Sequence, residues 1–222
     1  MKKLLAVIPA RGGSKGIPKK NIIPINGKPL ISWTINAAKS SNCINRLVLS
    51  SDDEEIIKVS TSLGCDVPFR RPASLSHDLS SSEEVIFHAI SELPNYEYAV
   101  LLQPTSPLRT AKDIDDAFDL MLKLGAPSCA SVCLSAESPY LMHKVNDNGL
   151  LESYIEPPKG YLRRQDLPKS YILNGAIYIV RVDWFLEKKV LFNNETVAYL
   201  MPNDRSVDID DKEDLQNFRS MI

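Results

Sequence analysis

Near its N-terminus the chain carries a short apolar run that leads directly into a loop rich in glycine and lysine: Leu4-Leu5-Ala6-Val7-Ile8, then Pro9-Ala10-Arg11-Gly12-Gly13-Ser14-Lys15-Gly16-Ile17-Pro18-Lys19-Lys20-Asn21. An unbroken apolar run that ends at a proline is typical of a strand buried on both faces of a parallel sheet. The glycines of the loop allow its backbone to approach a ligand closely. This stretch therefore predicts a first buried strand with a ligand-binding loop at its carboxyl end.

Apolar runs and amphipathic stretches alternate along the rest of the chain. The apolar runs predict strands at residues 46–51, 99–102, 176–180 and 197–200, with a short strand and loop at 66–72. The amphipathic stretches predict helices at about residues 29–40, with Pro29 in the first turn, and at 52–63, 81–93, 113–124 and from 211 onward. Strands that alternate with helices indicate a doubly wound α/β fold with a mostly parallel sheet, whose ligands lie beyond the carboxyl ends of the strands.

The alternation changes near residue 135. Residues 144–151 read as a hairpin with an Asn-Gly turn, and residues 156–169 contain three prolines and predict an irregular excursion. We expect residues 1–222 to form a single domain in which residues 138–170 are an inserted lobe. Such a projecting element commonly packs against a second subunit, so we expect a homodimer.

Composition and charge exclude several classes of protein. The chain has 222 residues, 44% of them apolar, and its 26 basic and 28 acidic side chains give a net charge of −2. These values exclude a disordered chain and provide no general basic surface for a nucleic acid. The apolar runs are too short to span a bilayer or to act as a secretion signal. The four cysteines form no C-x-x-C pair, which favours reduced thiols in a cytoplasmic protein. We therefore expect no membrane and no nucleic-acid partner.

The N-terminal loop carries four cations within ten residues, namely Arg11, Lys15, Lys19 and Lys20. Cations and exposed backbone amides together suit a nucleoside triphosphate, because both offset its charge. The glycine spacing matches neither the Walker loop nor the dinucleotide-binding fingerprint. A flexible basic surface loop is the alternative, but a position at the carboxyl end of a strand favours a ligand site.

A second motif, Ser206-Val207-Asp208-Ile209-Asp210-Asp211, lies near the C-terminus. In a strand, Asp208 and Asp210 would share one face while Val207 and Ile209 enter the core. Two neighbouring carboxylates repel unless a cation lies between them, and Mg²⁺ binds through one or two carboxylates plus substrate phosphates. The alternative is a solvated acidic end of a strand, with Asp211 capping the last helix.

Two further motifs are weaker. Gln103 and Arg109 bracket a rigid loop with two prolines, where they could hydrogen-bond a ligand, although a structural turn explains the spacing equally well. The adjacent Arg163 and Arg164 suit a two-point grip on a carboxylate, with a basic rim as the alternative. The three histidines are scattered without the spacing of metal ligands, and we interpret them as structural.

The string from Ile8 to Asn21 resembles the N-terminal signature of the acylneuraminate cytidylyltransferases. These are the CMP-sialic acid synthetases and their bacterial relatives that act on legionaminic or pseudaminic acid. The resemblance continues in family order through Arg71-Pro72, residues 78–82, residues 103–109, Arg164-Gln165-Asp166-Leu167-Pro168, residues 174–178 and residues 207–210. It therefore extends over nearly the whole chain.

This resemblance implies a nucleotide-diphosphosugar transferase-like fold that dimerises through the inserted lobe. It also implies a reaction between CTP and a nine-carbon 2-keto acid sugar that gives a CMP-sugar and pyrophosphate. The residues it assigns to the nucleotide are Arg11, Gly12, Gly13, Ser14, Lys15, Lys20, Asn21, Arg71, Ser81 and Ser82. Those assigned to the sugar are Gln103, Arg164 and Asn174, and those assigned to Mg²⁺ are Asp208 and Asp210. The catalytic set would be Arg11, Lys20, Asp208 and Asp210.

Two alternatives stay open at the level of the sequence. The same reaction could use legionaminic or pseudaminic acid, because the pocket residues that distinguish these sugars cannot be identified. The chain could also be a non-catalytic nucleotide-binding module on the same fold. Mere nucleotide binding does not need paired carboxylates, so Asp208 and Asp210 argue against the second alternative.

Overall fold

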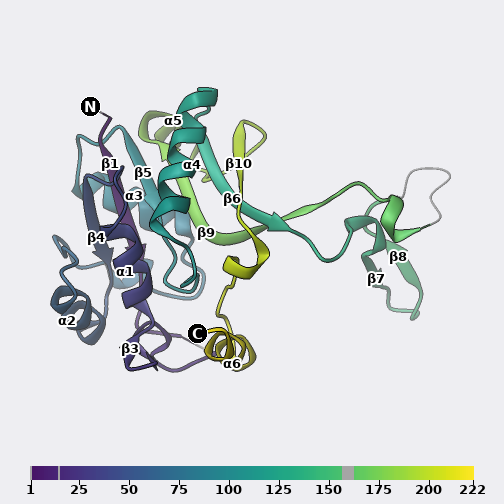
Figure 1. Ribbon diagram of the computed structural model, residues 1–222, viewed down its shortest axis with the longest axis horizontal. Coiled ribbons are helices and arrows are strands. Elements are labelled where there is room, and N and C mark those ends of the chain that lie inside the picture. Colours follow the sequence, from purple (N-terminus) through teal and green to yellow (C-terminus); the bar gives the residue numbers. More distant parts are fainter. Residues whose placement is uncertain (1, 15, 157–162) are drawn as a thin grey trace.

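The computed structural model describes residues 2–14, 16–156 and 163–222, and a six-stranded sheet forms its centre (Figure 1). In spatial order the strands are β10 (Thr196–Leu200), β6 (Ser128–Leu134), β9 (Tyr171–Arg181), β5 (Tyr98–Leu101), β1 (Leu4–Pro9) and β4 (Arg46–Ser50). Neighbouring strands run parallel except β9, which runs antiparallel to both β5 and β6. The predicted α/β fold with a mostly parallel sheet is confirmed.

Helices cover both faces of this sheet. α1 (Ile31–Lys39) and α4 (Ala111–Leu124) pack on one face, and α3 (Ser82–Glu92) and α5 (Val182–Lys188) pack on the other. β1 contributes to both cores because its side chains alternate: Leu4, Ala6 and Ile8 face α1 and α4, whereas Leu5 and Val7 face α3 and α5. All five side chains are fully buried, so the strand needs an unbroken apolar run.

Capping side chains fix where several helices begin. The Asp53 carboxylate accepts from the first amides of α2 (Glu54–Ser62), and Ser81 with Glu84 forms a capping box at the start of α3. α4 begins two residues earlier than we expected, at Ala111, because Thr110 is its N-cap and Asp113 is the partner in its capping box. The predicted starts of α2 and α3 thus agree with the structure, and α4 differs for an identifiable reason.

Some elements differ from the sequence-based expectations. Pro29 lies in β3 (Lys28–Pro29), which pairs with β2 (Pro24–Ile25), and not in the first turn of α1. Asn26 and Gly27 form the turn between these strands, both with positive φ. The strand expected at 66–72 is reduced to one bridge between Val48 and Asp66. β6 and α5 were not predicted, and β9 begins five residues earlier than the expected strand.

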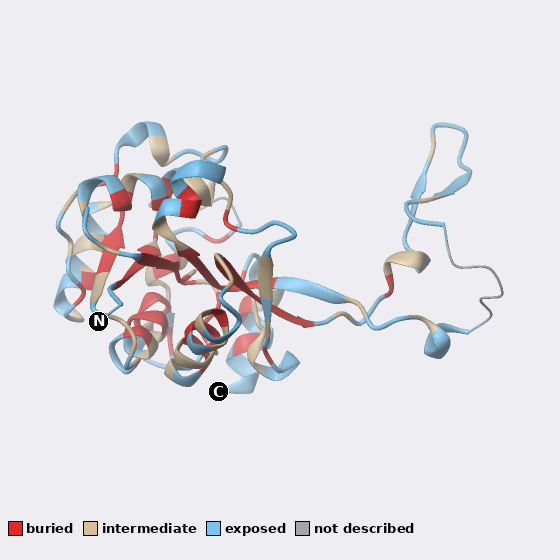
Figure 2. Ribbon diagram, turned by 90° about the horizontal axis from the view of Figure 1, so that it is seen from above, coloured by how far each residue is buried: buried red, intermediate tan, exposed pale blue. Residues whose placement is uncertain are grey.

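Residues 135–156 and 163–170, which we call the arm, leave the sheet where Leu134 pairs with Tyr171 and project away from the domain (Figures 1 and 2). The arm contains the short turns η3 (Pro139–Leu141) and η4 (Arg164–Asp166) and the predicted hairpin, formed by β7 (His143–Val145) and β8 (Leu151–Ser153). The turn of this hairpin is longer than two residues, since Asn146 and Leu150 close it and Gly149 takes a φ of 79°. Part of the expected irregular excursion, residues 157–162, lies outside the described residues.

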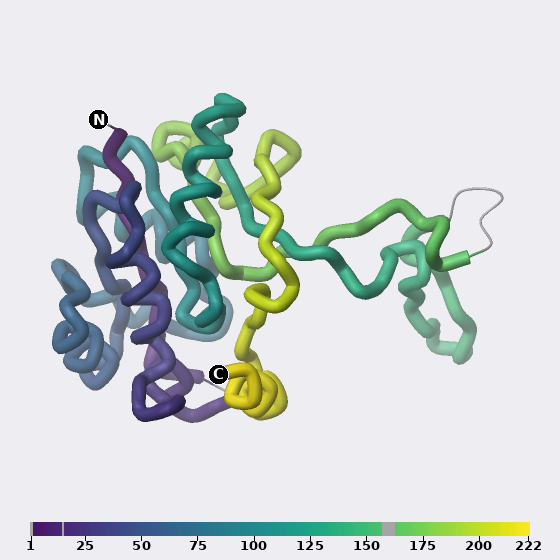
Figure 3. Tube along the Cα trace, viewed as in Figure 1, coloured from purple at the N-terminus to yellow at the C-terminus, as the bar shows by residue number. Residues whose placement is uncertain are grey.

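The C-terminal helix α6 (Lys212–Met221) packs beside the N-terminal loop and the β2–β3 hairpin (Figure 3). Ile17 of the loop, Ile209 and Phe218 belong to one buried cluster, in which Trp33 and Phe218 meet edge to face with ring centroids 5.5 Å apart. This cluster brings the two ends of the sequence together. Among the described residues, no helix is long and apolar enough to cross a membrane.

Candidate active site

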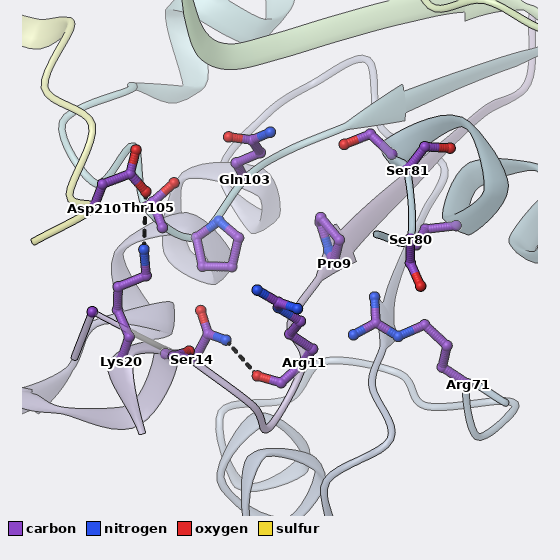
Figure 4. Close-up of a pocket in the computed structure, with 15 residues that line it drawn as sticks. Pro9, Arg11, Ser14, Lys20, Arg71, Ser80, Ser81, Gln103, Thr105 and Asp210 are labelled. Carbon is purple, nitrogen blue, oxygen red and sulfur yellow. Dashed lines mark hydrogen bonds and ion pairs between the residues drawn. The ribbon is translucent and has the colours of Figure 1, made fainter. Parts of the chain in front are cut away.

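A cavity of about 350 Å³ opens at the carboxyl ends of β1 and β5 (Figure 4). Its walls come from the N-terminal loop, the start of α3, the loop after β5 and the chain before α6. The residues that line it are Pro9, Arg11, Ser14, Gly16, Lys20, Asn21, Arg71, Ser80, Ser81, Ser82, Val85, Gln103, Pro104, Thr105 and Asp210. We call this cavity the cleft, and it lies where ligands of doubly wound folds bind.

The N-terminal loop and the C-terminal acids meet across the cleft. Lys20 Nζ lies 3.1 Å from Asp210 Oδ1, a contact drawn in Figure 4, and it also donates to the Ile209 carbonyl at 2.8 Å. A Cβ atom at Gly16 would lie 2.7 Å from the Asp210 carbonyl oxygen, so the two backbones are in direct contact. The two motifs that the sequence singled out therefore share one site.

Asp208 lies deeper than Asp210, and its Oδ1 atom is buried without a hydrogen-bond partner among the described residues. Burial raises the pKa of this carboxyl, and the neighbouring charges of Asp210 and Asp214 raise it further, against a hydrogen bond from Thr105 and the charge of Lys20. The segment is extended but forms no strand; Ile209 is nevertheless fully buried, as the predicted alternation requires.

This carboxylate pair has the chemistry of a divalent-cation site. A buried carboxylate oxygen without a partner is costly unless something positive binds it. Within the described ranges, no group of three or more His, Cys, Asp or Glu residues is placed to hold a metal ion. A cation at Asp208 and Asp210 would thus take its remaining ligands from substrate and water, as Mg²⁺ commonly does.

The loop cations are oriented by neighbouring groups. Arg11 forms an ion pair with Asp78 at 2.7 Å, and the amide of Asn21, which is 5% exposed, donates to the Arg11 carbonyl at 3.0 Å. Asn21 thus fixes the backbone from which Arg11 reaches into the cleft. The guanidinium of Arg71 lines the same cleft and is 4% exposed.

The glycines of the loop do not all present their amides to the cleft. The Gly12 N–H donates to Asp52 Oδ1 at 3.2 Å, and neither Gly12 nor Gly13 lines the cavity, whereas Ser14 does. Our expectation that the loop turns its amides outward is therefore wrong for Gly12. Lys15, assigned above to the nucleotide, lies outside the described residues.

The start of α3 supplies the serines of the cleft. Ser80, Ser81 and Ser82 all line it, and the Ser81 hydroxyl accepts from the Glu84 N–H at 3.1 Å as the helix cap. A helix N-terminus presents free amides and a partial positive charge to a ligand. The two serines assigned to the nucleotide are thus placed at the cleft by the capping of α3.

Gln103 lines the cleft, and Gly175 packs behind its side chain. Gly175 has a φ of 73°, and a Cβ atom there would lie 2.8 Å from Gln103 Oε1 and 3.5 Å from Asp208 Oδ2. Glycine is required at this position because any side chain would displace Gln103 and lie against Asp208.

Asn174 is not placed to bind a sugar, contrary to the assignment above. It is 6% exposed and its amide is fully engaged: Oδ1 accepts from Ser131 and from the Ala176 N–H, and Nδ2 donates to Ser206 at 2.9 Å. Asn174 thus ties β9 to β6 and to the chain that carries the acid pair.

Arg109 and Arg164 also lie outside the cleft. Arg109 is 2% exposed and donates to the carbonyls of Gln103 and Ala176, so it supports the site from within the core. Arg164 lies on the arm, where it pairs with Glu137 at 2.8 Å. Arg164 is therefore not placed to contact a sugar bound in the cleft of its own chain.

The sequence interpretation missed Thr105 and Asp52. The Thr105 carbonyl accepts the Ile209 N–H at 2.9 Å, so this residue links the loop after β5 to the acid segment. Thr105 lies inside a motif that the sequence already singled out, whereas no pattern in the sequence distinguishes Asp52 from the neighbouring acids.

Curated relatives match almost the full length of this chain. It is 35% identical over 96% of its length to N-acylneuraminate cytidylyltransferase of Escherichia coli, of which the match covers 51%. It is 36% identical over 96% of its length to pseudaminic acid cytidylyltransferase of Campylobacter jejuni, covering 94% of that protein. It is 32% identical over 94% of its length to CMP-N,N'-diacetyllegionaminic acid synthase of Legionella pneumophila, covering 91% of that protein. The chain spans about half the length of the N-acylneuraminate cytidylyltransferases that it matches.

Solved structures share the fold at low sequence identity. CMP:2-keto-3-deoxy-manno-octonic acid synthetase, solved in complex with CTP, superposes with a TM-score of 0.74 at 16% identity, covering 99% of this chain and 98% of that one. 4-Diphosphocytidyl-2C-methyl-D-erythritol synthase of Anaerococcus prevotii superposes with a TM-score of 0.68 at 14% identity. The match covers 99% of this chain and 97% of that one. The cytidylyltransferase family matches residues 5–217. The chain accordingly belongs to the cytidylyltransferase family.

Proposed function

We propose that this protein transfers CMP from CTP to the anomeric hydroxyl of an acidic nine-carbon 2-keto sugar and releases pyrophosphate. The observation that carries the proposal is the meeting of Lys20 with Asp210 and Ile209 across the cleft, which brings phosphate-binding cations and a carboxylate pair into one site. The names of three relatives, which activate N-acylneuraminic, pseudaminic and legionaminic acids, support the class of acceptor.

The chemistry is an in-line displacement at the α-phosphorus. The anomeric oxygen forms a bond to this phosphorus, the bond to the oxygen of the β-phosphate breaks, and pyrophosphate leaves. Such a reaction depends mainly on positioning and on neutralising charge. Arg11 and Lys20 line the cleft from the loop, where they would bind the phosphates and stabilise the charge of the leaving group.

Asp208 and Asp210 would hold Mg²⁺. The buried Oδ1 atom of Asp208 supports this assignment, because it has no hydrogen-bond partner in the part of the chain that the structure describes. Bound there, Mg²⁺ would supply a Lewis acid for the α-phosphate and for the attacking hydroxyl. Thr105, through its carbonyl bond to the Ile209 N–H, fixes the backbone between the two carboxylates.

The remaining cleft residues would divide between the two substrates. Arg71, Ser81 and Ser82 would bind the nucleotide at the start of α3, and Gln103 would contact the sugar. The four cysteines are free thiols, which agrees with the cytoplasmic location that we propose for an enzyme using CTP.

We further propose that the protein is a homodimer in which each arm serves the partner's cleft. The arm and its base expose large apolar side chains, among them Val145 at 67%, Leu151 at 70% and Tyr154 at 67%. A cluster of this kind marks an interaction surface. A second copy that covers this surface would also give Arg164 a role, because its guanidinium would then meet a sugar carboxylate in the partner's cleft.

The direct test is pyrophosphate release by the purified chain with CTP, Mg²⁺ and a panel of N-acetylneuraminic, pseudaminic and legionaminic acids. We expect release with at least one sugar and with CTP in preference to the other nucleoside triphosphates. A chain that binds CTP but releases no pyrophosphate with any acidic sugar would instead be a non-catalytic nucleotide-binding module.

A further inference from the structure

Asp52 lies in the connection between β4 and α2, next to the cleft. Its Oδ1 atom accepts the Gly12 N–H at 3.2 Å and lies 3.5 Å from the Nη2 atom of Arg71. Gly12 belongs to the N-terminal loop, whereas Arg71 follows α2 in the chain and lines the cleft. One carboxylate oxygen thus contacts two segments that the proposed function assigns to nucleotide binding.

The Arg71 side chain is buried and held at several points. Its backbone N–H donates to the Ser51 carbonyl at 2.9 Å, and its Nε donates to the Ser76 hydroxyl at 3.1 Å. Its Nη2 atom forms no hydrogen bond in the part of the chain that the structure describes, and Asp52 is the carboxylate beside it. Burial lowers the pKa of Arg71, and the charge of Asp52 opposes that change. Asp52 thus offsets the charge of a buried cation and orients it on the wall of the cleft.

Gly12 shows that the loop rests on the same segment. A Cβ atom at Gly12 would lie 2.6 Å from Asp53 Oδ2, so the loop backbone lies directly on residues 52 and 53. Because Asp52 already accepts the Gly12 N–H, that amide is not available to a phosphate. The bond instead sets the position from which the next loop residues, including Ser14, reach the cleft.

We propose that Asp52 is a positioning residue for CTP, whose carboxylate fixes the phosphate loop at Gly12 and orients the Arg71 guanidinium before the nucleotide binds. This inference rests on the proposed function, because it takes the loop and Arg71 to be nucleotide-binding groups. Without the carboxylate, both groups would have to be ordered during binding, and that cost would appear as weaker affinity.

The test measures CTP affinity by titration calorimetry without a sugar, so that no turnover is required. Asp52→Asn keeps an oxygen that can accept the Gly12 N–H but removes the charge beside Arg71, and we expect about tenfold weaker CTP binding. Asp52→Ala removes both contacts, and we expect a loss of about 30-fold or more. The KM for the sugar should stay within about twofold of the wild-type value, because neither contact reaches Gln103.

Two comparisons separate positioning from a general loss of structure. Asp115→Ala removes a carboxylate on α4 that accepts from the Ser41 hydroxyl and from the Asn42 and Cys43 N–H groups, outside the lining of the cleft. We expect this variant to lower the melting temperature but to leave CTP affinity within about twofold. In a double-mutant cycle, Asp52→Asn in an Arg71→Ala background should weaken CTP binding by less than about twofold, because the guanidinium that Asp52 orients is already absent.

The proposal is overturned if Asp52→Ala binds CTP like the wild type, if Asp115→Ala loses as much affinity as Asp52→Ala, or if the effects of Asp52→Asn and Arg71→Ala are additive. A wild-type chain that binds CTP but transfers CMP to no sugar would overturn the proposed function alone, since the affinities still test Asp52. Normal transfer with unchanged CTP affinity in Asp52→Ala would overturn the positioning role alone.

Discussion

Lys20 Nζ lies 3.1 Å from Asp210 Oδ1, although the two residues are near opposite ends of the sequence. The Lys20 side chain is 14% exposed and the Asp210 side chain is 77% exposed, so a largely buried ammonium meets a carboxylate that is open to the cleft. The same ammonium also bonds the Ile209 carbonyl. The loop and the acid pair are therefore one structural unit, and changes on either side test the proposed reaction.

Replacing Asp210 should separate chemistry from nucleotide binding. In Asp210→Ala we expect kcat to fall by about 10³-fold or more, because one of two carboxylates for the divalent cation is lost. The CTP dissociation constant should rise by less than about threefold when it is measured without Mg²⁺, because Arg11 and Arg71 remain. Pyrophosphate release and calorimetry measure the two quantities. The matched control is Asp204→Ala, which removes another exposed acid from the same C-terminal segment. A native kcat in Asp210→Ala would contradict the metal assignment.

Replacing Arg164 should affect the sugar and not the nucleotide. In Arg164→Ala we expect the KM for the sugar to rise by about 10- to 100-fold, which is the value of a hydrogen-bonded charge pair, with an unchanged KM for CTP. Steady-state kinetics with each substrate varied in turn measure both constants. Equal losses for the two substrates would remove Arg164 from the sugar site.

A mixture of two impaired variants, assayed at a sugar concentration at which each alone turns over slowly, tests whether Arg164 acts across the dimer. If Asp210→Ala and Arg164→Ala chains are unfolded together and refolded at equal amounts, a mixed dimer has one cleft with both native residues. Random pairing would then restore activity in about a quarter of all clefts. Activity no higher than the sum of the separate variants would show that Arg164 does not serve the partner's cleft.

The exposed side chains of the arm should hold the dimer together. Leu151 is 70% exposed on β8, and Leu151→Lys places a charge in the centre of this apolar surface. We expect a dimer in the wild type and a monomer in the variant, measured by light scattering after size-exclusion chromatography. Leu124→Lys, at a leucine that is 60% exposed at the end of α4, should leave the dimer intact, and a monomeric wild-type chain would contradict the assignment of the arm.

Asp113 should make stability depend on pH in the acid range. Burial alone would raise the pKa of this carboxyl, but hydrogen bonds from Arg205 and Thr110 outweigh burial and hold the pKa below its usual value. Because the folded-state pKa is depressed, the stabilisation is complete above the unfolded value of about 3.9 and is lost as the pH falls through the folded value.

We expect Asp113→Asn to lower the free energy of unfolding by about 1.5–3 kcal/mol at pH 7, and the difference from the wild type should shrink below about pH 4. Urea denaturation between pH 7 and pH 3 measures this difference. Asp116→Asn, which breaks an exposed pair with Lys112 on the same helix, should change stability by less than about 0.5 kcal/mol at every pH. A difference for Asp113→Asn that is the same at both ends of the range would contradict the depressed pKa.

Much of the fold was predictable from local patterns. The run from Leu4 to Ile8 identifies a buried strand because both its faces are covered, and the serine and aspartate caps mark helix starts because their side chains bond nearby amides. β6 was missed because serines interrupt its small apolar residues, so no continuous run of large apolar side chains marks it, and the position of Pro29 depends on the β2–β3 hairpin. The antiparallel direction of β9 follows from the arm, whose ends both lie at the same edge of the sheet.

By itself the sequence determined the chemistry available to this protein: a basic, glycine-containing loop, a pair of acids and a set of serines, each placed at the end of a regular element. Only the tertiary structure decided which of these groups share a site. It brought Lys20 to Asp210 through the cluster of Ile17, Ile209 and Phe218, and it set Arg109 and Asn174 in the interior and Arg164 on the arm. Local patterns depend on neighbours a few residues apart, whereas these placements depend on packing between residues that are distant in the chain, which no spacing within a motif encodes.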